Sequence, residues 1–472
     1  MPPSLRTGTK ASMALRVTFN GGAGSVTGSE FLVTTENTRV LVDCGIEQGK
    51  KFCDTDAAEP FAADPKTLNA LIVTHAHLDH IGRIPKLIRD GFTGTIYSTA
   101  PTRDLAALIL ADSVTILAEE AAACGTDPIY HREDVERAFS KWQTVPYHQE
   151  TPLGDLSFVI RQTGHILGAG SVRIKSSDGS IAFTGDIGHP PSPLIPDWEP
   201  ITDADALVMD AVYGDRVHEH RADRVAVLQE KLKEAIARGG AILIPAFSLE
   251  RTQLMLYHLS NFFDEGVLPK IPVFLDSPLA IHVTDLYRKY GNEYFRPEAK
   301  DEIRRERDIF SFPFLTMTGS REESEAIAKQ QNPKIIIAGA GMSHGGRIGR
   351  WETRYLPDPT TTLFIVGYQA PGSPGRLLQE NVKKVRINRQ EVKIQATIEN
   401  ITGWSGHADR DELVRFAQAS LPRTKVIFPS LGEPATARFL AQRIHDYVGV
   451  EAVVPSKGES WEIANGKVYK MK

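Results

Sequence analysis

Apolar residues in the first part of the chain come in short runs that are separated by turn-forming residues. From Leu15 to about Ala204, most of these runs have the length of a strand. The clearest are Leu15–Phe19, Glu30–Val33, Arg39–Val42, Leu68–Thr74, Leu156–Gln162, Ser171–Lys175 and Ser180–Thr184. One longer segment, Thr102–Ala123, repeats its apolar positions with a helical period. This order predicts a sandwich of mixed sheets flanked by helices.

From about Ala206 the pattern changes to fully apolar runs that alternate with helical stretches. These runs are Ala241–Ala246, Val273–Asp276, Lys334–Ala338 and Thr362–Val366. Such an alternation is typical of a parallel sheet that helices cover on both faces. Beyond about Val392 the first pattern returns, so we predict one domain that is interrupted by a second. The predicted divisions are a loose tail at 1–12, the first part of one domain at 13–205, the inserted domain at 206–391 and the last part at 392–472.

Composition narrows the class of protein. With 472 residues, 41% of them hydrophobic and 24% charged, the chain reads as an ordinary globular protein of two or three domains. Its three cysteines are too few for a disulfide framework, which favours a reducing cytoplasm and a metal site without thiolates. We see neither a membrane span nor a secretory signal. The net charge of −5 disfavours a protein that coats nucleic acid through bulk charge.

The strongest chemical pattern is HAHLDH at residues 75–80, directly after an apolar run. Side chains two positions apart in an extended segment share a face, so His75 and His77 can bind one ion together. Asp79 and His80 then begin a predicted helix and point at a second ion. Imidazole and carboxylate donors without sulfur suit zinc that is kept open for catalysis.

Three further turns carry residues of the ligand type. TGHILGAG at 163–170 places His165 between glycines, and FTGDIG at 183–188 ends a predicted strand with Asp186, whose two oxygens can bridge two cations. Asp43 in LVDCG is suited to orient a ligand from behind. Each of these residues alone is more often a cap or turn residue. Together with HAHLDH they predict a site for two metal ions.

These motifs resemble those of a known family. HAHLDH, TGHILGAG and TGDIG are similar to motifs of the metallo-β-lactamase fold, while VMDAVYGDR, GMSHGGR, QAPGSPGR and WSGHAD resemble its β-CASP branch of RNA-processing nucleases. The resemblance implies an α/β protein, namely an αββα metallo-β-lactamase sandwich with an inserted, Rossmann-like β-CASP domain. It also implies an active site in the cleft between the domains, where a zinc-bound hydroxide attacks phosphorus.

The resemblance further implies a role for each motif residue. The implied ligands of two zinc ions are His75, His77 and His165 for the first, Asp79 and His80 for the second, and Asp186 as the bridge. The implied catalytic residues are Asp79, Asp210 and His407. His407, paired with Asp210, would act as the general acid that protonates the leaving 3′ oxygen. Without the family pattern, Asp210 reads as a strand-end cap and His407 as a loop residue.

One position departs from the family pattern. RNA-cleaving members carry a further histidine in a VHGE turn after a late strand, whereas this chain reads FPSLGE at 428–433, with Leu431 at the histidine position. Leucine cannot bind zinc, so we expect a weakened second zinc site. His189 is close to the site in sequence but is more typical of a loop residue. DNA-processing members carry an apolar residue here, which keeps DNA open as a substrate.

Basic residues gather in residues 341–395, which hold nine Lys or Arg and four Asp or Glu and therefore carry a net charge of +5. The same segment has two glycine-rich loops, and such loops at helix starts bind phosphate through backbone N–H groups. The residues expected to contact substrate there are Ser343, Arg347, Ser373 and Arg376. The alternative is a pair of ordinary turns beside a solvated basic face.

The sequence thus predicts a cytoplasmic, zinc-dependent nuclease that hydrolyses phosphodiester bonds of single-stranded RNA. The alternatives are a DNA-directed β-CASP nuclease and a catalytically weak homologue that binds RNA. A hydrolase of small molecules is least favoured, because the inserted domain and the basic loops would then lack a purpose. The expected partner is RNA, with DNA as the alternative and no membrane. A homodimer is left open.

Overall fold

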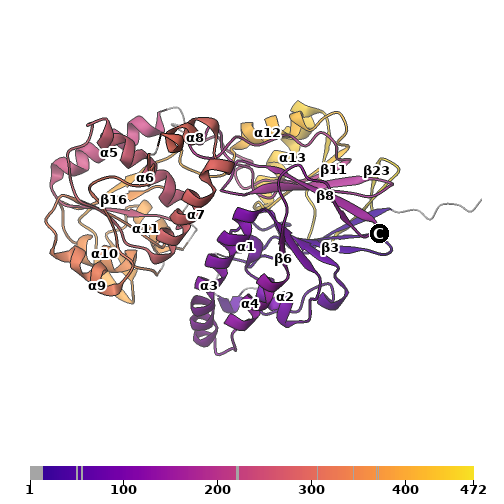
Figure 1. Cartoon of the computed structure of the whole chain (residues 1–472), viewed down its shortest axis with the longest axis horizontal. Helices are drawn as coiled ribbons and strands as arrows, with labels where there is room; N and C mark the ends of the chain where they lie inside the picture. Colours follow the sequence, from indigo (N-terminus) through magenta and orange to yellow (C-terminus); the bar gives the residue numbers. More distant parts are fainter. Residues whose placement is uncertain are drawn as a thin grey trace, which may run out of the picture.

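The computed structural model describes residues 14–48, 52–54, 57–218, 223–305, 307–343, 345–367, 369 and 372–471. The predicted tail at 1–12 lies outside this part of the chain. The described residues form a two-sheet sandwich, on the right in Figure 1, and a second α/β unit beside it on the left.

The first sheet of the sandwich joins both ends of the described chain. In spatial order its strands are β23 (Lys467–Lys470), β22 (Ser460–Ala464), β1 (Leu15–Phe19), β2 (Phe31–Thr34), β3 (Arg39–Val42), β4 (Ala70–Ile72), β5 (Thr95–Ser98) and β6 (Trp142–Thr144). β1 pairs antiparallel with both β2 and β22, so the last hairpin completes the sheet that the N-terminal strands begin. Side chains of β1 alternate between buried and more exposed positions, as the pleat of a strand requires.

The second sheet faces the first across a hydrophobic core. Its strands in spatial order are β21 (Glu451–Ala452), β20 (Val426–Ser430), β11 (Ala206–Asp210), β10 (Ser180–Phe183), β9 (Gly170–Lys175), β8 (Leu156–Gln162) and β7 (Thr151–Leu153). Phe19 of β1 and Phe428 of β20 meet edge to face, with ring centroids 5.3 Å apart. Aromatic contacts of this kind join the two sheets.

Helices cover the outer face of each sheet. Over the first sheet lie α1 (Leu78–Ile81), α2 (Ile84–Arg89), α3 (Ala100–Ala123) and α4 (Arg132–Ser140), and over the second lie α12 (Arg410–Ala419) and α13 (Pro434–Val448). Two short 3₁₀ turns, Phe52–Asp54 and Pro65–Thr67, lie on the side of the first sheet. The layers therefore follow the order helix, sheet, sheet, helix, which confirms the predicted αββα sandwich.

The second unit is built on a parallel sheet. Its strands in spatial order are β14 (Leu315–Met317), β13 (Val273–Leu275), β15 (Lys334–Ala338), β12 (Ala241–Pro245), β16 (Thr362–Ile365) and β19 (Thr397–Asn400). All five neighbouring pairs run parallel. The continuous apolar strands predicted from the sequence are buried on both faces, as parallel strands between helices must be.

Two groups of helices cover this parallel sheet. One hydrophobic cluster includes α5 (Arg224–Arg238), α6 (Arg251–Asp264), α7 (Pro278–Tyr294) and α8 (Pro297–Arg304). On the other side lie α9 (Arg321–Ala326), a 3₁₀ turn (Ile327–Lys329), α10 (Ile348–Tyr355) and α11 (Pro374–Gln379). A separate hairpin, β17 (Lys384–Ile387) with β18 (Gln390–Lys393), packs beside α10 and α11.

Strand pairing sets where the chain passes between the two units. β11 lies between β10 and β20 in the sandwich, so the chain leaves the sandwich after Asp210. β19 pairs with β16 in the parallel sheet, so the chain returns only after Asn400. Both passages come later than the predicted boundaries at 206 and 392. Apolar pattern alone does not reveal these positions, because β11 is as continuously buried as the strands of the parallel sheet.

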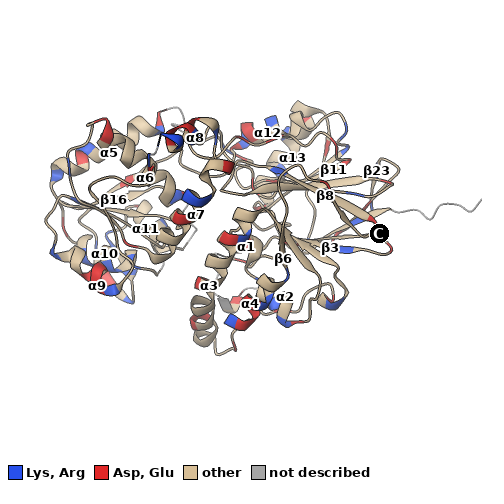
Figure 2. Ribbon diagram, in the orientation of Figure 1, with Lys and Arg blue, Asp and Glu red and all other residues tan. Residues whose placement is uncertain are grey.

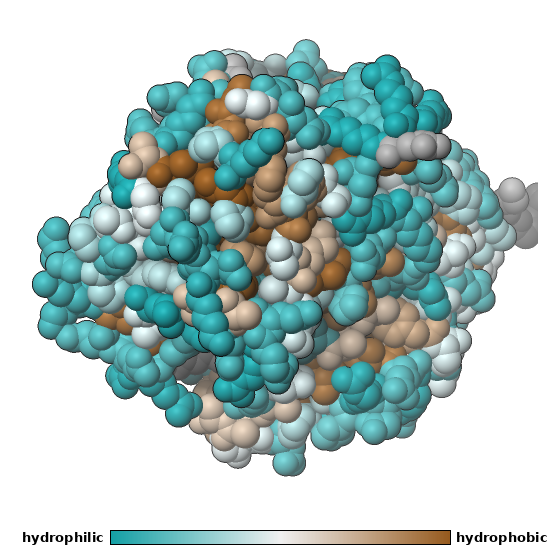
Figure 3. Space-filling model, turned by 60° about the vertical axis from the view of Figure 1, so that its left-hand side comes forward, coloured by the Kyte–Doolittle hydropathy of each residue, from teal (hydrophilic) through white to brown (hydrophobic). Residues whose placement is uncertain are grey.

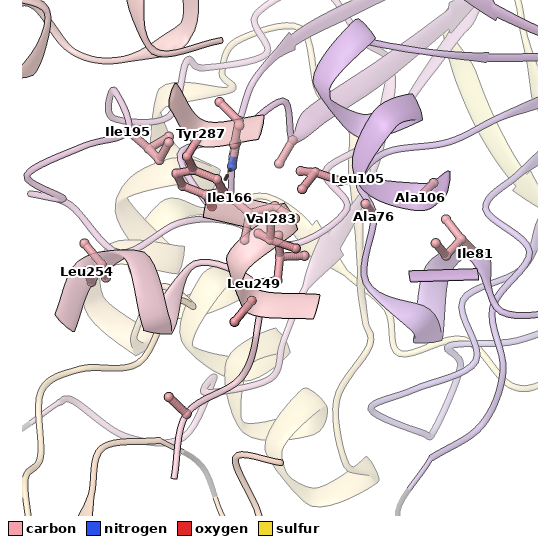
Figure 4. Close-up of a cluster of buried hydrophobic side chains, with 14 of the residues drawn as sticks. Ala76, Ile81, Leu105, Ala106, Ile166, Ile195, Leu249, Leu254, Val283 and Tyr287 are labelled. Carbon is pink, nitrogen blue, oxygen red and sulfur yellow. Dashed lines mark hydrogen bonds between the residues drawn. The ribbon is translucent and has the colours of Figure 1, made fainter. Parts of the chain in front are cut away.

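A single hydrophobic cluster crosses from one unit to the other (Figure 4). Ile166 and Leu167 belong to the loop that carries His165, and they pack with Val283 and Tyr287 of α7. The backbone N–H of Leu167 also donates to the Tyr287 hydroxyl at 3.5 Å. The inserted unit therefore helps to fix the position of a predicted metal-ligand loop in the sandwich.

Charged residues lie mainly on the helices and loops, and the strands carry few of them (Figure 2). On the face drawn in Figure 3, hydrophobic residues form patches within a largely hydrophilic surface. Within the described residues, no helix is long and apolar enough to cross a membrane.

The cysteines depart from expectation. Cys53 and Cys124 form a disulfide that links the first 3₁₀ turn to the end of α3, with Cα atoms 5.6 Å apart, while Cys44 is free and buried. The sequence reasoning favoured a reducing environment because three cysteines are too few for a disulfide framework. The fold brings two of them together across 71 residues of chain, a proximity that spacing does not reveal.

Leu167→Ala tests the cross-unit core. Leu167 is fully buried, so we expect the loss of about 2–4 kcal/mol of stability from burial and cavity effects. Thermal denaturation should show a lower midpoint than in the wild type. Leu377→Ala is the matched control, since Leu377 is 37% exposed and should change the midpoint little. Equal midpoints for the two variants would contradict the proposed packing.

Candidate metal centre

HAHLDH follows the C-terminal end of β4, an interior strand of the first sheet, and His77 is the residue that precedes α1. His77 Nδ1 lies 3.1 Å from His75 Nε2 and 3.1 Å from His165 Nε2. Asp186 Oδ2 lies 3.2 Å from His75 Nε2 and 3.4 Å from His165 Nε2. Four donor atoms from three separate segments thus face a common point.

The spacing of these donors fits a tetrahedral zinc ion. At bond lengths of about 2.05 Å, tetrahedral ligand atoms stand about 3.3 Å apart, close to the observed contacts. Two of the rings have a hydrogen-bond partner at the nitrogen that faces away from the cluster. His165 Nδ1 lies 3.1 Å from the Gly406 carbonyl oxygen, and His75 Nδ1 lies 3.1 Å from Thr74 Oγ1. When the outer nitrogen of an imidazole donates a hydrogen bond, its inner nitrogen keeps a lone pair for the metal.

A second cluster begins on the other oxygen of Asp186. His80 Nε2 lies 3.4 Å from Asp186 Oδ1, and His80 Nδ1 donates to Asp43 Oδ2 at 2.7 Å. Asp43 itself accepts from the Thr74 backbone N–H at 2.8 Å and from Ser29 Oγ at 3.1 Å. Asp43 therefore fixes the orientation of the His80 ring.

The loop after Asp43 passes very close to the HAHLDH turn. A Cβ at Gly45 would lie 1.5 Å from the Asp79 carbonyl oxygen, so only glycine permits this approach. The Gly45 N–H donates to the Ser29 carbonyl, and the Ser29 N–H donates to the Asp79 carbonyl. This contact holds Asp79 and His80 beside the carboxylate that orients His80.

Leu431 occupies the position where the family pattern has histidine. Its side chain is buried and contacts Gly22. It belongs to the same hydrophobic core cluster as Phe31, between the two sheets. Its backbone has a φ of 57°, which is unusual for leucine. The residues predicted for the second ion, Asp79, His80 and Asp186, carry nitrogen or oxygen donor atoms, whereas Leu431 cannot replace the missing histidine.

His407 and Asp210 also meet at this centre. His407 Nδ1 lies 3.6 Å from Asp210 Oδ2 and 3.9 Å from Asp186 Oδ2, distances for ion pairs rather than hydrogen bonds. Asp210 is fully buried and accepts from the backbone N–H groups of Ile187 and Val212 at 3.0 and 2.8 Å. The fixed carboxylate of Asp210 therefore faces the imidazole of His407, which is 26% exposed to solvent.

Burial and neighbouring charges set the protonation of the cluster. Burial lowers the pKa of His77 and that of His165 well below the usual range, and nearby imidazoles add to the effect, so both rings are neutral and ready to bind metal. Burial raises the pKa of the Asp79 carboxyl. Burial acts the same way on Asp186, but His80 and His75 outweigh it and hold its pKa well below the usual range.

The two histidines beside carboxylates behave in the opposite way. Burial alone would lower the pKa of His80, yet Asp186 and Asp43 raise it well above the usual range. Burial also opposes protonation of His407, but Asp186 and Asp210 raise its pKa to about 9. A divalent cation beside Asp186 would offset that carboxylate and bring the pKa of His407 back toward neutrality.

Comparisons with known proteins place this centre in a family. Profiles described as a Metallo-beta-lactamase superfamily domain, a Beta-Casp domain and a Zn-dependent metallo-hydrolase RNA specificity domain match residues 32–193, 252–378 and 391–455. Ribonuclease TTHA0252 of Thermus thermophilus is 35% identical over 413 residues, which cover 88% of this chain and 93% of that protein. The chain belongs to the β-CASP family. It is a metal-dependent hydrolase of the metallo-β-lactamase fold.

Other relatives agree with this membership. The transcription termination factor FttA of Pyrococcus horikoshii is 32% identical over 463 residues, which cover 94% of this chain and 70% of that protein. A crystal structure of a protein of unknown function from Enterococcus faecalis shares the fold, with a TM-score of 0.54, 12% identity and coverage of 95% and 99% of the two chains.

The four residues predicted to bind substrate lie in the β-CASP domain and have protein partners. Ser343 donates to Glu352 at 2.6 Å, and Arg347 donates to Asp276 at 2.6 Å. The side chain of Ser373 caps α11, and Arg376 donates to Glu380 at 2.7 Å. Arg376 is 44% exposed and Arg347 is 22% exposed, so Arg376 is the freer of the two arginines.

Sequence reasoning missed a set of residues that lies closer to the metal centre. Arg224, Glu250 and Arg251 of the β-CASP domain line a pocket together with His165, one of the candidate metal ligands. Glu250 and Arg251 follow β12, in the segment PAFSLER. The sequence does give one indication of these residues, because they follow a predicted parallel strand. Loops at the carboxyl ends of parallel strands commonly carry binding residues.

Asp210→Asn tests the link between Asp210 and His407. The substitution keeps the shape but removes a charge that raises the pKa of His407, so the protonated imidazole is lost at a lower pH. For a reaction that needs this acid, the alkaline limb of the profile of kcat/KM against pH should move to lower pH, and kcat should fall by about 100-fold. An unchanged alkaline limb would mean that another group supplies the proton.

Proposed function

We propose that this chain is a zinc-dependent ribonuclease that hydrolyses phosphodiester bonds of single-stranded RNA. The observation that carries the proposal is the convergence of His75, His77, His165 and Asp186 beside a second cluster that shares Asp186, with His407 at the open side. Four nitrogen and oxygen donors without sulfur suit zinc in an open catalytic site.

In this proposal each residue of the metal centre has a specific role. We assign His75, His77 and His165 to the first zinc, Asp79 and His80 to the second, and Asp186 to both. Bound zinc would lower the pKa of a water molecule and polarise the phosphate that it attacks. Asp43 keeps the Nδ1 proton of His80 in place, which leaves Nε2 of that ring for the metal.

His407 is the proton donor in this proposal. Its imidazole is held near the buried carboxylate of Asp210, at 3.6 Å, and is partly exposed toward the open side of the centre. A protonated ring there can neutralise the 3′ oxygen as it leaves phosphorus, which lowers the barrier to bond cleavage. Asp210 accepts two backbone N–H groups, so it keeps its orientation while the ring gives up its proton.

Support for RNA rather than DNA comes from the relatives. A profile whose description names RNA specificity covers residues 391–455, which include His407. The Thermus thermophilus relative that matches nearly its whole length is named a ribonuclease. Leu431 favours DNA as the second candidate, because an apolar residue stands at this position in DNA-processing members of the family.

A paired cleavage assay tests the proposal. Protein stripped of metal and reloaded with zinc should cut a labelled single-stranded RNA, and a DNA of the same sequence should be cut at least about tenfold more slowly. His165→Asn should abolish cutting, because it removes a first-site donor. His445→Asn changes the same residue type at an exposed position of α13 and should leave the rate intact. Cutting of DNA alone would replace RNA as the substrate, and cutting by the metal-free protein would end the zinc assignment.

Leu431→His tests the expected deficit in the second zinc site. The new imidazole should strengthen binding of the second zinc ion by about tenfold or more, as measured by a zinc titration. Leu431→Gln is the control, because it also places a polar group in the buried position but supplies no imidazole. An equal second-zinc affinity in the two variants would show that this position does not reach the metal.

A further inference from the structure

The two segments that connect the sandwich to the β-CASP domain meet beside the candidate proton donor. The outgoing segment follows β11, and the returning segment carries His407. The backbones of the two segments are joined, because the Arg410 N–H donates to the Arg216 carbonyl oxygen at 3.0 Å. The backbone N–H of His218 also donates to Asp409 Oδ2 at 3.3 Å, and Asp409 is the residue that caps α12. His218 therefore lies beside the turn that carries His407.

The imidazole of His218 contacts the backbone of His407 directly. His218 Nε2 lies 3.1 Å from the His407 carbonyl oxygen. Because a carbonyl oxygen only accepts, Nε2 is the donor of this hydrogen bond. The His218 ring also meets the rings of Tyr213 and His189 edge to face, with centroids 4.6 and 4.7 Å away. These ring contacts keep the N–H of His218 directed at the His407 carbonyl.

The direction of the His407 ring depends on its backbone, because its contact with Asp210 is loose. His407 Nδ1 has no hydrogen-bond partner among the described residues, and it lies 3.6 Å from Asp210 Oδ2. An ion pair at this distance attracts the ring but does not fix its direction as a hydrogen bond does. The backbone of His407 is held more closely, since its N–H donates to Ser405 Oγ at 3.2 Å and its carbonyl oxygen accepts from His218.

We propose that His218 is a positioning residue for His407. Its hydrogen bond holds the peptide that carries the acid, so that the imidazole faces the 3′ oxygen as the bond from that oxygen to phosphorus breaks. A catalytic group must be held to within about 0.5 Å, and a displacement of about 1 Å can cost about 100-fold in rate. His218 acts through His407 and transfers no proton itself. The inference rests on the proposed nuclease function, because it concerns the acid of that reaction.

The test compares two substrates that differ in their need for an acid. The p-nitrophenolate that leaves uridine 5′-(p-nitrophenyl phosphate) is stable without a proton, whereas the 3′ oxygen of an RNA strand is not. His218→Phe keeps a ring between Tyr213 and His189 but removes the donor. In this variant we expect kcat for single-stranded RNA to fall by about 10- to 100-fold at an unchanged KM. Hydrolysis of the nitrophenyl ester should fall far less.

Three further variants separate positioning from a general loss of structure. His218→Gln should recover most of the RNA-cleaving rate, because its amide Nε2 can donate to the same carbonyl oxygen. Val217→Ala changes the neighbouring residue, which is 43% exposed, and should leave both rates unchanged. In a His407→Asn background, His218→Phe should cause no further loss, since a residue that acts through the acid has no effect once the acid is gone.

Amide hydrogen exchange measures the turn without any reaction. Peptides that cover residues 403–410 should exchange faster in His218→Phe than in the wild type, and His218→Gln should restore the slower exchange. If the wild type hydrolysed neither substrate, the proposed function would be refuted, and the exchange rates would still decide whether His218 holds the turn. Equal losses on both substrates in His218→Phe, a further loss in the His407→Asn background, or unchanged exchange would overturn the positioning role.

Discussion

The candidate metal centre depends on one electrostatic constraint, which is the close approach of buried metal-binding atoms. Three imidazoles and one carboxylate place these atoms 3.1–3.4 Å from their neighbours. Lone pairs that face one another at such distances repel, so the cluster is stable only when a cation stands among them or when a proton is shared. Asp186 lies at its centre and reaches toward the second cluster with its other oxygen. Burial lowers the pKa of His77 and of His165 well below the usual range, whereas nearby carboxylates raise the pKa of His80 and that of His407.

The packing between the two domains keeps this cluster in place. His165 comes from a loop whose next two residues, Ile166 and Leu167, belong to the same hydrophobic core as α7, so this loop and the β-CASP domain pack together. The same contact brings Arg251 into the wall beside His165.

Much of the fold was predictable, because the spacing of apolar residues along the sequence indicates which side chains are buried in strands and helices. The runs at 15–19, 39–42, 156–162 and 334–338 became strands with the predicted bounds. The passages between domains were harder, since β11 and β19 pair with strands far away in sequence. For the site, short motifs located the ligand-type residues, but Arg251 has no motif. Its place beside His165 depends on how the β-CASP domain packs against the sandwich, which only the folded chain reveals.

The central claim is that nitrogen and oxygen donors of this chain hold zinc. X-ray absorption at the zinc edge of the zinc-loaded protein measures this most directly. The account predicts a first shell of nitrogen and oxygen at about 2.0–2.1 Å, imidazole scattering beyond it, and weaker imidazole scattering in His75→Asn. A sulfur atom near 2.3 Å, or a spectrum that His75→Asn leaves unchanged, would contradict it.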